Sequence, residues 1–66
     1  MNVFCNGSAQ DLPDQATVLD LLLLIELEPK GLAVAVNDSL VLRPNWQTHG
    51  LEHNDRVTLL RAAQGG

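Results

Sequence analysis

Residues 17–36 read TVLDLLLLIELEPKGLAVAV, and this stretch predicts a helix followed by a buried strand. Thr17 is a favourable N-cap residue, and Asp20, three positions later, gives a weak form of the capping box. Four apolar residues share one stripe of the helix: Val18, Leu21, Leu22 and Ile25. Further leucines make the helix apolar nearly all round, as expected of a helix that lies across a sheet.

The strand of this stretch is predicted at Leu32–Val36, after Pro29 and Gly31 have ended the helix. Every residue of this strand is apolar, which is typical of a central strand rather than an edge strand. A helix packed on a sheet therefore forms the centre of the predicted fold.

Two strands are predicted before the helix and two more after the central strand. Asn6-Gly7 joins the first two and is a strong hairpin signal, because both central residues of a type I′ turn need a positive φ. The four strands are Met1–Cys5, Ser8–Leu12, Leu40–Leu42 and Arg56–Ala62. Trp46 is predicted to cover one end of the core from an irregular or 3₁₀ connection. The expected fold class is α+β, with a mixed sheet whose last strand lies beside the first and parallel to it.

Length and composition predict one small globular domain. The chain has 66 residues, of which 45% are hydrophobic and 18% are charged, so it can hold a single core. Cys5 is the only cysteine, which excludes an intramolecular disulfide and fits a reducing compartment. The chain opens without a basic, apolar leader, and the apolar stretch 18–27 is too short to span a membrane. We therefore expect a cytoplasmic protein with no membrane partner.

Charge and motif content argue against a nucleic-acid-binding protein and against an enzyme. Eight acidic and four basic residues give a net charge of -4, which repels phosphate backbones. The sequence contains no Gly-rich phosphate loop and no nucleophile elbow. A metal site would have to use Cys5, His49 and His53, whose spacing does not suit a closed site. We expect no catalytic or metal-binding residue, and we interpret Cys5 as a core residue in preference to a persulfide relay.

The remaining candidate for chemistry is the C-terminal sequence Ala63-Gln64-Gly65-Gly66. Two glycines can thread as extended backbone into a narrow enzyme cleft, where a side chain would clash. Small residues are also common at termini that have no function. The predicted organisation is a domain at residues 1–62 and a flexible Gly-Gly tail at residues 63–66.

Several motifs occur together, in one order and over the whole chain. They are Asn6-Gly7, Thr17-Val18 with Leu21-Leu22, Val34–Asn37, Val41 with Arg43 and Trp46, Asn54–Val57, and the terminal Gly65-Gly66. Together they resemble the ThiS family of sulfur carriers, whose fold is the ubiquitin-like β-grasp. The resemblance implies about five strands in the order ββαβββ, with one helix across the sheet. Asn54 departs from the pattern, since the family often has glycine there, and Cys5 replaces a larger apolar residue.

The resemblance also implies a function for the terminus. An E1-like adenylating enzyme, ThiF, would activate the Gly66 carboxylate with ATP, and a sulfur donor such as a cysteine desulfurase would convert it to a thiocarboxylate. Gly65 would give the tail passage into the active site. Thiazole synthase, ThiG, would then receive the sulfur for the thiazole ring of thiamine. ATP and magnesium would belong to the partner, so this chain is expected to be a carrier with no cofactor of its own, and not an enzyme.

A partner surface is also expected on one face of the sheet. Strand alternation places Phe4 and Leu60 on the same face, and if their strands are neighbours they form an exposed apolar patch beside the tail. We hypothesise that this patch docks on the adenylating enzyme. Arg61, just before the tail, is a candidate to pair with an acid of the partner, although exposed pairs of this kind contribute little.

Two other functions fit the same residues. The small subunit of molybdopterin synthase shares the fold, the Gly-Gly tail and the thiocarboxylate chemistry, although length and the Arg43-x-x-Trp46 element favour the thiazole carrier. A β-grasp binding or regulatory module with an inert tail, or a modifier conjugated to lysines, belongs to another class. An alanine added after Gly66 would disable a carrier or modifier and leave an inert-tail module working.

Overall fold

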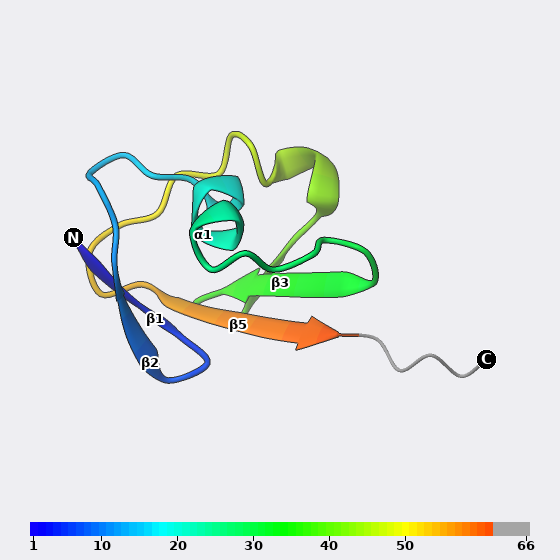
Figure 1. The fold of residues 1–66 in the computed structure, drawn as a ribbon, viewed down its shortest axis with the longest axis horizontal. Coiled ribbons are helices and arrows are strands. Elements are labelled where there is room, and N and C mark those ends of the chain that lie inside the picture. The colour runs from blue at the N-terminus through cyan, green and yellow to red at the C-terminus, as the bar shows by residue number, and fades with distance from the viewer. Residues whose placement is uncertain (62–66) are drawn as a thin grey trace.

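The computed structural model describes residues 1–61, which form a five-stranded sheet, one α-helix and one 3₁₀ turn (Figure 1). The elements are β1 (Asn2–Cys5), β2 (Ser8–Asp11), α1 (Val18–Leu24), β3 (Leu32–Val36), β4 (Ser39–Val41), η1 (Arg43–Asn45) and β5 (Arg56–Arg61). Their order is the one predicted from the sequence. The largest difference in length is at the helix, which is shorter than expected.

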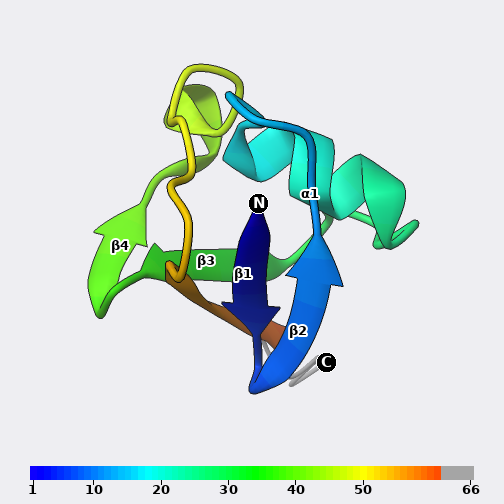
Figure 2. The same ribbon diagram turned by 90° about the vertical axis from the view of Figure 1, so that its left-hand side faces the viewer.

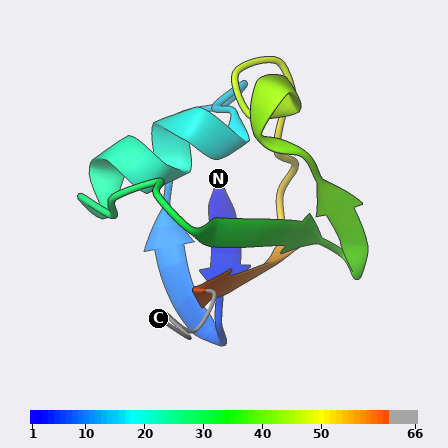
Figure 3. The ribbon, with the colours of Figure 1, turned by 90° about the vertical axis from the view of Figure 1, so that its right-hand side faces the viewer.

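The sheet has the order β2-β1-β5-β3-β4, with β5 at its centre. β1 and β5 run parallel, and every other neighbouring pair is antiparallel. The prediction that the last strand lies beside the first and parallel to it is therefore confirmed. β3 lies between β5 and β4, which confirms it as an inner strand. In the two side views α1 lies over one face of the sheet, and no helix of the described residues covers the other face (Figures 2 and 3).

Both hairpins turn through two residues with positive φ. Asn6 and Gly7 have φ of 49° and 86°, and Asn37 and Asp38 have φ of 50° and 69°. These values are those of type I′ turns, whose twist matches that of the strands on either side. The turn predicted at Asn6-Gly7 is confirmed, and Asn37-Asp38 forms a second turn of the same type.

The start of α1 satisfies each of its first backbone N–H groups. Asp20 N–H donates to Thr17 Oγ1 at 3.2 Å, and Thr17 N–H donates to Asp20 Oδ2 at 2.9 Å, which completes the predicted capping box. The connection after η1 supplies the other acceptors: Val18 N–H donates to the His49 carbonyl and Leu19 N–H to the Trp46 carbonyl, both at 3.0 Å. The helix is therefore fixed to this connection as well as to the sheet.

The end of α1 lies earlier than Pro29 and Gly31, so the predicted end was wrong. Ile25 is the C-cap, and Glu26 adopts a φ of 56°. Leu27 N–H donates to the Leu22 carbonyl at 3.0 Å, and Glu26 N–H donates to the Leu23 carbonyl at 3.2 Å. This pair of bonds is the Schellman motif, here with glutamate in the position that usually holds glycine. The chain therefore turns away from the helix axis before it reaches the residues that marked the end in the sequence.

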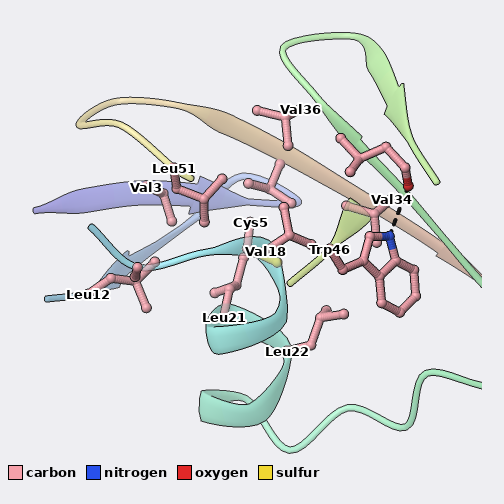
Figure 4. Close-up of a cluster of buried hydrophobic side chains, with 13 residues drawn as sticks. Val3, Cys5, Leu12, Val18, Leu21, Leu22, Val34, Val36, Trp46 and Leu51 are labelled. Carbon is pink, nitrogen blue, oxygen red and sulfur yellow. Dashed lines mark hydrogen bonds between the residues drawn. The ribbon is translucent and has the colours of Figure 1, made fainter. Parts of the chain in front are cut away.

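The core lies between α1 and the sheet (Figure 4). Its buried residues are Val3, Cys5, Leu12, Ala16, Val18, Leu21, Leu22, Val34, Val36, Val41, Trp46, Leu51 and Val57. Trp46 covers one end, as predicted, and its indole N–H donates to the Val41 carbonyl at 2.8 Å. Leu23 and Leu24 are exposed, so the all-round apolar character of the helix does not reflect burial on every side. Within residues 1–61, no helix is long and apolar enough to cross a membrane.

Candidate functional site

The residues expected to carry the chemistry, Gly65 and Gly66, lie outside the described residues, as do tail residues 63 and 64 and the last predicted strand residue, Ala62. The structure therefore defines the candidate site through what precedes them. β5 carries the chain to Arg61 through the middle of the sheet. We call Leu59–Arg61 the tail root. Its surroundings are the part of the candidate site that the structure describes.

The outer face of the sheet is the face that α1 does not cover. Phe4 and Leu60 both lie on it and are 37% and 68% exposed, so the predicted exposure of both side chains is confirmed. They are not adjacent, however. Phe4 is in register with Arg56, four residues before Leu60, which places the two about 13 Å apart along β5. The continuous apolar patch expected from Phe4 and Leu60 is therefore not formed, because strand adjacency alone does not set register.

A different set of apolar residues extends from Leu60 toward β4. Its cross-strand partner on β3 is Ala33, and the next outward residue of β3, Ala35, is paired with Leu40 on β4. Leu40 is exposed to nearly the same extent as Leu60. We call these four residues, Ala33, Ala35, Leu40 and Leu60, the outer patch. It lies on the β3 side of the tail root, whereas Phe4 lies beside Ala9 and Arg56.

The Arg61 side chain is bound within the molecule. Its guanidinium donates to the Lys30 carbonyl at 2.6 Å and to the Glu28 carbonyl at 2.9 Å, both in the loop between α1 and β3. Pairing of Arg61 with Leu32 brings the side chain to this loop. From its position before the tail, Arg61 was a candidate to pair with an acidic residue of a partner. Nothing in the sequence indicated that it binds these two carbonyls.

Asn6 has a second role that its turn motif did not indicate. Leu59 N–H donates to Asn6 Oδ1 at 2.8 Å, and Asn6 Nδ2 donates to the Leu59 carbonyl at 3.2 Å. Backbone bonds at the two ends of the parallel pair run from Phe4 N–H to Asp55 O and from Asn6 N–H to Val57 O, each 2.9 Å. The amide of Asn6 therefore continues the ladder for one more step after β1 has ended.

The other chemical candidates, Cys5, His49 and His53, take part in the packing and hydrogen bonding of the fold. Cys5 is buried in the core, and burial raises the pKa of its thiol by penalising the charged form. His53 Nδ1 accepts a hydrogen bond from Asn2 N–H at 3.0 Å, and the His49 carbonyl is used by α1. Across residues 1–61, no three metal-ligating side chains are grouped and no pocket is present, so the described part of the site is a surface.

One departure from the family pattern has a structural explanation. Asn54 has a φ of 71°, a conformation that glycine adopts freely and that asparagine tolerates better than most residues. Asp55 accepts hydrogen bonds from Glu52 N–H at 2.7 Å and from Asn37 Nδ2 at 2.9 Å. The turn before β5 is therefore retained with asparagine in place of glycine.

Comparisons with known proteins agree with this geometry. The sulfur carrier protein ThiS of Escherichia coli strain K12 is 29% identical over 66 residues, and the match covers 100% of both chains. The crystal structure of the thiamine biosynthesis protein ThiS from Geobacter metallireducens superposes with a TM-score of 0.86 at 22% identity, with 100% of both chains covered, which confirms the β-grasp fold. The model of the ThiS family matches residues 3–66. This chain belongs to the ThiS family.

Proposed function

We propose that this chain is a sulfur carrier whose Gly66 carboxylate is adenylated, converted to a thiocarboxylate and used as the sulfur source for thiazole formation in thiamine biosynthesis. The observation that carries the proposal is the extent of the family match, which covers residues 3–66 and so includes both terminal glycines. The Escherichia coli relative of the same length is itself named a sulfur carrier.

The proposed chemistry begins with an unreactive group. A carboxylate at neutral pH is a poor electrophile, so one of its oxygens first attacks the α-phosphorus of ATP and releases pyrophosphate. Hydrosulfide then attacks the acyl carbon, a C–S bond forms, and the C–O bond to AMP breaks. The products are the thiocarboxylate, AMP and a proton. A persulfide donor gives the same product once a thiol has reduced the acyl disulfide that it forms.

The partners follow from this sequence of steps. An E1-like enzyme binds ATP and supplies the adenylating site, and a donor such as a cysteine desulfurase supplies sulfur. A thiazole synthase accepts the sulfur from the charged carrier. We place these reactions in the cytoplasm, because the one thiol of the chain, Cys5, is a core residue that needs no disulfide partner. The chain itself serves as a co-substrate and holds no catalytic residue in this scheme.

The first test is intact mass after the chain has been incubated with an E1-like enzyme, ATP and a sulfur source. We expect replacement of one oxygen by sulfur, located on Gly66 by fragmentation. A chain with one alanine added after Gly66 is the control and should remain uncharged. If the native chain is not charged by an enzyme preparation that charges another carrier of this family, the proposal is wrong.

A further inference from the structure

We propose that Asn6 and Arg61 are positioning residues for the carrier reaction, holding the tail root from both sides so that the terminal residues enter the adenylating site from one direction. This inference rests on the proposed function. It assigns a role to two side chains outside the terminal Gly-Gly pair, and it is argued from the hydrogen bonds that they make at or from the tail root.

Asn6 holds the root on the β1 side. β1 ends at Cys5, so no strand residue remains to pair with Leu59. The Asn6 amide replaces it, because it presents an acceptor and a donor in one plane and binds both the N–H and the carbonyl of Leu59. Aspartate would keep only the acceptor, and glycine would keep neither, although both fit a position with a φ of 49°.

Arg61 holds the root on the other side. Its guanidinium spans the carbonyls of Glu28 and Lys30, so the loop after α1 is joined to the last described residue of β5. A planar fork with several N–H groups can bind two acceptors at once, whereas an uncharged glutamine amide cannot span the same two carbonyls. The tail root is therefore fixed at Leu59 by Asn6 and at Arg61 by its own side chain, in addition to its pairing with β3.

Asn37 provides a matched comparison at the other end of β5. It occupies the first position of the second type I′ turn with a φ of 50°, close to that of Asn6. Its Oδ1 accepts a hydrogen bond from Arg56 N–H at 2.9 Å. The two asparagines therefore have the same backbone conformation and both bind the backbone of β5, but only Asn6 binds at the tail root.

The test compares Asn6→Gly with Asn37→Gly in steady-state adenylation by the E1-like partner, followed as pyrophosphate release. Both variants keep a residue that accepts positive φ, and urea unfolding of each shows the loss of stability. We expect Asn6→Gly to lower kcat on the order of tenfold with KM little changed, because the terminal carboxylate is misaligned while the outer face is intact. Asn37→Gly should keep the kcat and KM of the native chain.

Arg61→Gln gives an independent measurement if Asn6→Gly does not fold. In Arg61→Gln we expect the same selective loss of kcat. Where Asn6→Gly does fold, faster amide exchange at Leu59 should report the lost hydrogen bond directly. Equal kcat values in the native chain, Asn6→Gly and Arg61→Gln would overturn the positioning role, as would equal losses in Asn6→Gly and Asn37→Gly. In both of those cases the charging of the native chain still supports the proposed function. Failure to charge the native chain would overturn both.

Discussion

Glu26 adopts a left-handed backbone conformation, which costs free energy in any residue with a Cβ. The Schellman motif requires this conformation immediately after the C-cap. Glu26→Gly should therefore raise the free energy of unfolding by about 1 kcal/mol, after allowing for the greater freedom of glycine in the unfolded chain. Urea unfolding measures the change. Glu28→Gly is the control, because Glu28 has no positive φ and its replacement should lower stability slightly. A loss of stability in Glu26→Gly would contradict this account of the helix end.

Cys5 predicts how stability depends on high pH. Burial raises the pKa of its thiol above the ordinary value of 9.0, so the unfolded chain releases this proton first as the pH rises. The contribution of Cys5 to stability is therefore complete below pH 9.0 and is lost progressively above it. Urea unfolding at several pH values should show the native chain losing more stability above pH 9.0 than Cys5→Ala does. Parallel pH curves for the two proteins would contradict the assignment.

Cys5→Ala also separates the two roles considered for the thiol. The side chain packs in the core and is buried, which agrees with a structural role. Removal of a small buried side chain should cost about 1 kcal/mol of stability while thiocarboxylate formation continues. Intact mass of the charged Cys5→Ala chain is the measurement. If a folded Cys5→Ala chain could not be charged, the hypothesis that Cys5 acts as a persulfide relay would be favoured instead.

Individual residues were predictable where their backbone conformation has a chemical signature. Asn6-Gly7 indicated its turn because few residues accept positive φ, and Thr17 indicated the cap because its hydroxyl replaces a missing backbone acceptor. The amide of Asn6 on Leu59 and the guanidinium of Arg61 on two carbonyls could not be predicted in this way. Those contacts depend on register and loop path, which are set by the whole fold.

At the level of secondary structure, α1 depends strongly on its ends. It has seven residues, too few to be stable as an isolated helix. Thr17→Ala would leave the Asp20 N–H without its capping oxygen, and we expect a loss of about 1 kcal/mol. Thermal or urea unfolding measures the loss. Thr17→Ser, which keeps the capping hydroxyl, serves as the control. Equal effects of the two substitutions would mean that the capping box contributes nothing specific.

The order of the elements was predictable because turn residues and apolar runs alternate clearly along the chain. The end of α1 was not predictable, because Glu26 adopts a positive φ that glutamate does not favour. Leu27, which follows it, packs against the core. Pro29 and Gly31 belong to the loop that follows. The exposure of Leu23 and Leu24 was not predicted either, because a helix packed on one face of a sheet buries one side only, whatever the residue types on its other side.

For the molecule as a whole, the proposed docking face can be tested with two leucines of nearly equal exposure. Leu60 on the outer patch is 68% exposed, and Leu23 on α1 is 67% exposed. Leu60→Asp should raise the KM for the adenylating enzyme about tenfold without loss of folding, because it places a charge in an apolar contact. Leu23→Asp should leave KM unchanged. Steady-state kinetics, with urea unfolding of both variants, is the measurement. Equal KM values for Leu60→Asp and the native chain would exclude Leu60 from the interface.

The chemistry of the candidate site stays a prediction, and its described surroundings were predicted only in part. Gly65-Gly66 pointed to the carboxylate because a terminus without side chains suits a narrow enzyme site, and the family match extends over both residues. The prediction of a continuous apolar patch formed by Phe4 and Leu60 was wrong, because alternation along a strand fixes the face of a side chain and not its neighbour on the next strand.

The central place of β5 has a consequence for synthesis of the protein. β5 joins the hairpin of β1 and β2 to the hairpin of β3 and β4, and it is made after all the other elements of residues 1–61. Before β5 leaves the ribosome, the two hairpins share no strand pairing, and isolated hairpins are marginally stable in water. Folding therefore follows translation of β5, and a chain that stops before β5 cannot close the sheet.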